Sequence, residues 1–131
     1  MKPKLFTAAF LATVTSLVTP MSSLAQAPEL SMQEQSAVSA LNDALSTRNN
    51  RLVGMINDRG KADDLQSICL RLDTGTTVKE LDAKIVERVL QIPDTNMRKQ
   101  VSQYFAAVEV IAIRRLCPRH GEQLDASIKN P

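Results

Sequence analysis

The chain has 131 residues, of which 44% are hydrophobic, 23% are charged and 3% are aromatic. This length fits one compact domain, and the apolar content argues against a disordered or collagen-like protein and against a large enzyme. The 16 Lys and Arg residues and 14 Asp and Glu residues leave a formal net charge of only +2.

The first 25 residues have the features of a secretory signal peptide. Two lysines within the first four residues precede the uncharged, mostly apolar stretch 5–18, which is too short to span a bilayer. Small residues follow at the spacing that a signal peptidase requires. We expect cleavage after Ala25, because a cut after Ala27 would leave Pro28 directly behind it. An uncleaved interfacial or membrane anchor is the alternative. Cleavage predicts an exported protein, periplasmic or extracellular, with no stable membrane anchor.

Loss of this segment balances the charge of the remaining chain. Lys2 and Lys4 leave with it, so 14 basic side chains face 14 acidic ones. A neutral chain has no general attraction for nucleic acid and no Lys/Arg cluster dense enough for an anionic membrane surface. Tyr104 and Phe105 are then the only aromatic residues, too few for platforms that stack single-stranded nucleic acid. We therefore expect no nucleic-acid partner.

The two cysteines, Cys69 and Cys117, both lie beyond the signal segment. An exported chain with an even number of cysteines is most simply interpreted as carrying a disulfide. Closing a loop of about 49 residues stabilises a fold by roughly 4 kcal/mol on the chain-entropy model. That is a large share of the roughly 5–15 kcal/mol of net stability typical of a small domain.

Capping signals and apolar periodicity predict a helical domain over residues 31–118, after a loose leader at 26–30. Ser31 and Glu34 have the spacing of a capping box, which begins a first helix that we expect to end at Gly60. Whether this helix is continuous or broken at Asn49-Asn50 stays open. One face repeats at helical spacing and carries Val38, Leu41, Leu45, Leu52, Met55 and Ile56.

A second and a third helix follow. The second is predicted to begin at Asp63 and to stop at Gly75. A second capping box at 77–80 precedes the third helix, predicted over 79–91, which must end before Pro93.

The fourth helix is predicted to be the most buried. Asp94 or Thr95 can cap it, and Pro118 stops it. Residues 119–131 are expected to form a polar tail, and no stretch alternates as a β-strand does. The sequence therefore predicts an all-α fold, a small four-helix bundle whose disulfide joins the second helix to the end of the fourth.

Residues suited to catalysis or metal binding are scarce. His120 is the only histidine and falls in the expected tail, so we predict no catalytic residues and no enzyme. Cys117 and His120 have a spacing that offers two metal ligands, but a closed zinc site needs four and would need Cys69 free. We therefore expect neither a metal nor a cofactor. Glu109 interrupts an apolar stretch and is expected on the solvated face of the fourth helix.

The first helix offers a possible interaction surface, because its apolar face is long for a core of this size. We expect a protein partner or a second copy of the chain to bind Leu45, Leu52, Met55 and Ile56. The alternative is that these residues pack on the third and fourth helices.

The segment around the cysteines, roughly 65–120, resembles a family of small exported helical proteins, domain of unknown function 732. The resemblance rests on a cysteine helix that ends at a glycine, and on a later apolar helix that ends in Cys-Pro. The residues that carry it are Ile68, Cys69, Leu72, Asp73, Gly75, Val78, Leu116, Cys117 and Pro118. The resemblance implies a paired disulfide, a helical fold and export, and the family has no established activity.

A second likeness is to periplasmic acid-stress chaperones, which are short, helical and tied by one disulfide. Protonating all acids would leave the 14 basic side chains and His120, a charge of +15. Such self-repulsion opens compact states. The sequence thus predicts a non-enzymatic binding or structural module, with an acid-stress chaperone as the alternative.

Overall fold

The structure is a computed structural model that describes residues 29–130. The predicted signal peptide and its cleavage site after Ala25 lie outside the described residues. Across residues 29–130 the secondary structure is helical, without a β-strand, so the predicted all-α fold class is confirmed.

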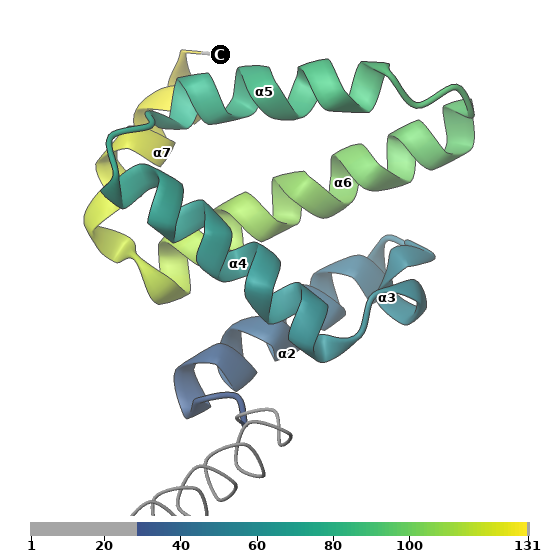
Figure 1. Cartoon of the computed structure of the whole chain (residues 1–131), viewed down its shortest axis with the longest axis horizontal. Helices are drawn as coiled ribbons and strands as arrows, with labels where there is room; N and C mark the ends of the chain where they lie inside the picture. Colours follow the sequence, from purple (N-terminus) through teal and green to yellow (C-terminus); the bar gives the residue numbers. More distant parts are fainter. Residues whose placement is uncertain (1–28, 131) are drawn as a thin grey trace, which may run out of the picture.

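Four long helices, two shorter ones and two irregular turns make up the described chain. In chain order they are α2 (Met32–Thr47), α3 (Leu52–Met55), α4 (Asp58–Asp73), α5 (Val78–Leu90), α6 (Thr95–Ile111), the π-helical turn η1 (Ala112–Leu116), the 3-10 turn η2 (Pro118–His120) and α7 (Gly121–Lys129). Figure 1 shows α5 and α6 as an antiparallel hairpin, with α2 on the opposite side of α6 from α5. The C-terminal helix α7 packs beside the start of α5.

Most helix ends lie where their capping residues predict them. Ser31 forms a complete capping box with Glu34, and Thr77 and Asp94 cap α5 and α6 through their side-chain oxygens. After α4 the chain turns at Gly75 with a φ of +108°, a backbone conformation that costs glycine little. The amide of Thr76 donates to the carbonyl of Arg71 at 3.0 Å, which completes the helix-ending turn.

The first predicted helix is broken at Asn49-Asn50. α2 ends at Thr47, and Asn49 has a φ of +54°, in the left-handed region that asparagine tolerates better than most residues. The side chain of Asn50 is buried, donates to the carbonyl of Gln100 at 2.8 Å and accepts from the amide of Leu52 at 2.9 Å. Asn50 therefore fixes the connection between α2 and α3 against α6 and binds the first amide of α3.

The second predicted helix begins earlier than expected. α4 starts at Asp58, and its cap is Asn57, which accepts from the amide of Gly60 at 2.7 Å. The predictions of a start at Asp63 and of a helix end at Gly60 were therefore wrong. Gly60 lies in the first turn of α4, where a Cβ atom would approach the Ile56 side chain to 3.0 Å.

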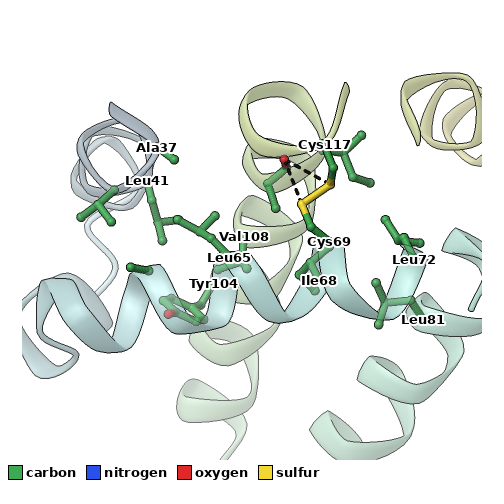
Figure 2. Packing of buried hydrophobic residues seen from close by; sticks show 14 of the residues in the cluster. Ala37, Leu41, Leu65, Ile68, Cys69, Leu72, Leu81, Tyr104, Val108 and Cys117 are labelled. Carbon is green, nitrogen blue, oxygen red and sulfur yellow. Dashed lines mark hydrogen bonds between the residues drawn. A yellow bond between two sulfur atoms is a disulfide. The ribbon is translucent and has the colours of Figure 1, made fainter. Parts of the chain in front are cut away.

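The core runs between α2, α4 and α6 and extends to α5 and α7 (Figure 2). Its buried side chains recur at helical spacing, as the apolar periodicity predicted. They are Ala37, Val38, Leu41, Leu45, Leu52, Ala62, Leu65, Ile68, Cys69, Leu72, Val78, Leu81, Tyr104, Val108, Ala112, Ile113, Cys117 and Leu124.

The expected polar tail at 119–131 is a packed helix over most of its length, so that prediction was wrong. Leu124 on α7 is only 2% exposed and belongs to the core. The Gln123 side chain accepts from the amide of Val78 at 3.2 Å, and the Ser127 hydroxyl donates to Asp82 at 3.1 Å. One buried apolar residue in a nine-residue helix gives no periodic signal, and these partners lie about 45 residues away in the sequence.

Replacing Leu124 by alanine tests whether α7 is part of the domain. We expect the free energy of unfolding to fall by about 2–4 kcal/mol, because the change leaves a cavity in a packed core. Urea unfolding followed by circular dichroism measures it. Ile128 on the same helix is 61% exposed, and Ile128→Ala should change stability by less than about 0.5 kcal/mol. Equal effects of the two variants would show that α7 is not packed through Leu124.

Candidate functional site

The predicted disulfide is present and joins α4 to the end of η1. Cys69 and Cys117 are bonded, with their Cα atoms 5.8 Å apart, and both are buried. The amide of Cys117 donates to the carbonyl of Ala112 at 3.0 Å, which closes a turn one residue wider than an α-helical turn. The same carbonyl oxygen lies 3.6 Å from both sulfur atoms. These are contacts rather than hydrogen bonds, because disulfide sulfur carries no hydrogen.

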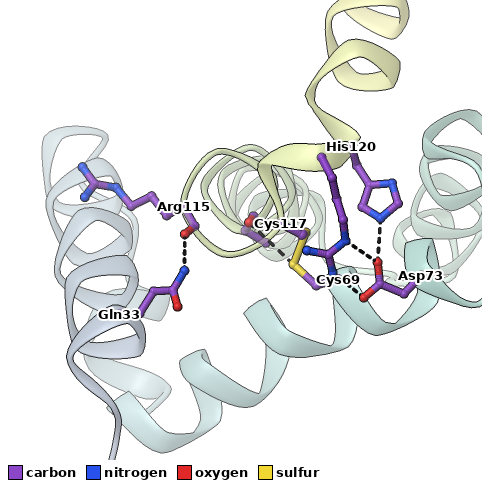
Figure 3. Close-up of a disulfide and its surroundings, with 8 residues drawn as sticks. Gln33, Cys69, Asp73, Arg115, Cys117 and His120 are labelled. Carbon is purple, nitrogen blue, oxygen red and sulfur yellow. Dashed lines mark hydrogen bonds and ion pairs between the residues drawn. A yellow bond between two sulfur atoms is a disulfide. The ribbon is translucent and has the colours of Figure 1, made fainter.

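His120 lies against the end of α4 rather than in a tail. Its Nε2 atom is 2.7 Å from the Asp73 carboxylate, toward which the ring is directed in Figure 3. The Arg119 Nε atom donates to the same carboxylate at 2.9 Å. The hydrogen bonds from Arg119 and His120 lower the pKa of Asp73 to about 2. This cluster attaches the C-terminal segment to α4.

The alternative metal site at Cys117 and His120 does not fit this arrangement. The Cys117 sulfur is bonded to Cys69, so it is not a thiolate ligand, and His120 is paired with Asp73. Among residues 29–130, no three His, Cys, Asp or Glu side chains are grouped so as to hold a metal ion.

The apolar face of the first predicted helix is mostly core. Leu45 and Leu52 are buried, and Ile56 is half-buried against the same cluster. Met55 alone of the four is well exposed, at 61%. The expected interaction surface is therefore not continuous, because α4 and α6 cover most of it.

A different apolar surface is open, in a groove of about 740 Å³ between α5, α6 and α7. Across the described chain, seven large apolar side chains are well exposed, and three of them, Val86, Val110 and Ile128, line this groove. Each comes from a different helix. The other apolar lining residues are Val78, Ile85, Ala106, Leu124 and Ala126. Sequence reasoning missed this groove because it treated α7 as a tail.

Two carboxyl groups lie in the wall of the groove. Glu109 on α6 is 6% exposed and is hydrogen-bonded to Asp82 on α5, which also accepts from Ser127 on α7. Burial raises the pKa of Glu109 well above its ordinary 4.5, and the hydrogen bond and negative charge of Asp82 raise it further. The raised pKa favours the protonated form of Glu109, which is the form that can donate a hydrogen bond to Asp82.

The prediction that Glu109 lies on a solvated face was wrong. An acidic residue in an apolar stretch is usually exposed, but here α5 and α7 lie over that side of α6.

The groove carries little free charge. The raised pKa of Glu109 favours its neutral form, Asp82 accepts a hydrogen bond from Ser127, and Lys79 is the one cation among the lining residues. Polar groups that can bind a peptide backbone surround the apolar walls, among them Ser102, Gln123 and Asn130. The chemistry of the groove is therefore that of a surface for an apolar, nearly uncharged ligand.

Comparison with protein-family models, with curated proteins and with solved structures finds no match to this chain. None of the helices in residues 29–130 combines the length and the apolar character needed to cross a membrane.

Replacing Glu109 by glutamine tests the protonated acid. In the wild type, the unfolded chain loses this proton near pH 4.5 while the folded chain keeps it. The free energy of unfolding therefore falls as the pH rises from about 4.5 toward the raised pKa. Glutamine still donates to Asp82 and does not titrate. We expect Glu109→Gln to be more stable than the wild type by about 1–3 kcal/mol at about pH 8, and similar to it at about pH 4.

Urea unfolding at the two pH values measures this difference. Glu87→Gln removes an exposed acid from α5 and serves as the matched control, with little change expected at either pH. A Glu109→Gln variant with the same pH dependence as the wild type would contradict the assignment of the proton.

Proposed function

We propose that this protein is an exported, non-enzymatic binding module that takes up an apolar, nearly uncharged segment of another protein in the groove between α5, α6 and α7. The observation that carries the proposal is the convergence of Val86, Val110 and Ile128, from three helices, on one groove. A groove between helices is a common receptor for a short helix or an extended segment.

Two further observations support a binding role. The groove is large enough for several side chains, since small-ligand pockets are commonly about 300–1,000 Å³. Its carboxyl groups, Asp82 and Glu109, are used in bonds that hold α5, α6 and α7 together. The other acid and base pair, Asp73 and His120, likewise joins elements of the fold.

Export rests on the sequence features of residues 1–25 and on the disulfide. Disulfides persist mainly in oxidising compartments, and Cys69 and Cys117 are paired and buried.

Charge introduced into the groove should weaken binding. We expect the wild-type protein to reduce the aggregation of a heat-denatured model client, citrate synthase, at neutral pH. Ile128→Asp should weaken this effect about 10–100-fold in the concentration required, since burying one large apolar side chain contributes roughly 1.5–3 kcal/mol. Light scattering measures client aggregation.

Met55→Asp is the matched control, because Met55 and Ile128 are both 61% exposed and Met55 lies outside the groove. Equal loss in both variants, or no suppression by the wild type, would contradict the proposal. Circular dichroism of each variant checks that it is folded.

An acid-activated chaperone is the second candidate, and the attachment of α7 favours it. Carboxylates hold this helix and the turn before it: Asp73 binds Arg119 and His120, and Asp125 on α7 lies 2.5 Å from Arg114. Protonation of these acids replaces the charge-assisted contacts at both attachments with weaker, neutral ones. Release of α7 would uncover the apolar walls of the groove to unfolded proteins.

The pH range of this release follows from Asp73. Its pKa is about 2 in the folded protein and 3.8 ordinarily, so its stabilising effect is present above about pH 4 and is lost as the pH falls toward about 2. We expect the wild type to lose helicity in this range. The Asp73→Asn variant should be less stable than the wild type above about pH 4, and its helicity should change less as the pH falls. Asp63→Asn, an exposed position on α4, is the control. A wild type that stays compact at about pH 2 and suppresses no aggregation there would exclude this candidate.

A further inference from the structure

A second cavity, of about 380 Å³, lies on the other flank of α5, between α4, α5 and α6. It is separate from the groove described above, and only Ile85 lines both. Ligand binding in this cavity therefore does not require the function proposed for the groove.

The floor of this cavity is apolar and continuous. Its side chains are buried or half-buried: Ile68 comes from α4, Leu81, Ile85 and Val89 from α5, Ile92 from the chain just after α5, and Val101 and Phe105 from α6. From Leu81 to Ile92 the chain follows α5 and its end, a length of about 16 Å at the rise of an α-helix. An elongated apolar ligand fits this shape better than a round one.

The rim of the cavity is cationic. Arg71 on α4 and Lys84 and Arg88 on α5 line it, and all three side chains are exposed. In the described part of the chain, the ion pairs found are Lys61–Asp58, Arg114–Asp125, Arg119–Asp73 and His120–Asp73, so none neutralises this rim. Lys84 and Arg88 are also four residues apart on one helix, where like charges repel each other.

The helix dipole explains the positions of two of these three cations. Arg71 and Arg88 lie in the last turns of their helices, where cations interact favourably with the helix dipole. Lys84 lies in the middle of α5 and has no such explanation.

The single acid among the lining residues is already bound. Asp64 accepts a hydrogen bond of 2.5 Å from the hydroxyl of Tyr104, which is buried. Burial and this carboxylate raise the pKa of the phenol, so it remains a donor. Asp64 keeps its negative charge, but the three cations outnumber it, so the net charge of the lining side chains is positive.

We propose that this cavity binds a long-chain carboxylate of the fatty-acid class, with its hydrocarbon chain along α5 and its carboxylate at Arg71, Lys84 and Arg88. An apolar floor with three unpaired cations at its rim is complementary to a ligand that is apolar over most of its length and singly negative at one end. A multiply charged, polar anion such as a nucleotide would leave the seven apolar floor residues without a partner.

Dodecanoate is the probe. Isothermal titration calorimetry with the purified, oxidised protein should show one site per chain, with dodecanol, which lacks the charge, binding at least about tenfold more weakly. Lys84→Gln combined with Arg88→Gln should lower dodecanoate affinity about tenfold or more and leave dodecanol affinity unchanged. Arg48→Gln combined with Lys99→Gln removes two exposed cations elsewhere and should change neither affinity.

The remaining outcomes separate this site from the groove. Ile128→Asp should leave dodecanoate binding intact; if it abolishes that binding, the ligand occupies the α5–α6–α7 groove and the proposal is overturned. Equal affinity for dodecanoate and dodecanol in the wild type would show that the cations do not bind the carboxylate, which overturns the proposal. A protein that binds phosphatidylglycerol vesicles but no dodecanoate in solution would assign the rim to a membrane surface instead, which also overturns the proposal.

Discussion

The contact between the Cys69–Cys117 disulfide and Ala112 fixes the end of the long α6–η1 segment against α4. The position of everything that follows depends on it. From Cys117 the chain turns through η2, where Arg119 and His120 bind Asp73 at the end of α4, and α7 then runs beside α5. The groove exists only because α7 is held there, so the disulfide, whose Cys117 lies four residues before α7, helps to determine the shape of the groove.

Two cavities of this domain lie on opposite flanks of α5. The helices α2, α4 and α6 bury their apolar residues against one another, whereas α5 packs on α6 and α7. Its two flanks are therefore left with apolar walls of different electrostatic character. On the flank of α7 the acids Asp82 and Glu109 bond to each other, and little charge remains. On the flank of α4 three cations have no acidic partner among residues 29–130. One helix thus presents two kinds of chemistry.

The features that the sequence predicted correctly were mostly set by interactions between residues close together in the chain. Ser31, Gly75, Thr77 and Asp94 act on the backbone within a few residues, so their positions predicted helix ends correctly. The disulfide followed from the cysteine count and the expected compartment.

The failures were non-local. Leu124 is buried by helices far away in the sequence, Glu109 is covered by α5 and α7, and the break at Asn50 depends on the carbonyl of Gln100. The groove needed all three of its helices placed in space before it became visible. Ile85 lines both cavities. If occupancy of one cavity shifts α5, it changes the shape of the other, and by linkage the second ligand must then affect the first to the same degree. Under that condition, a domain of this size would report the presence of one molecule through its affinity for another.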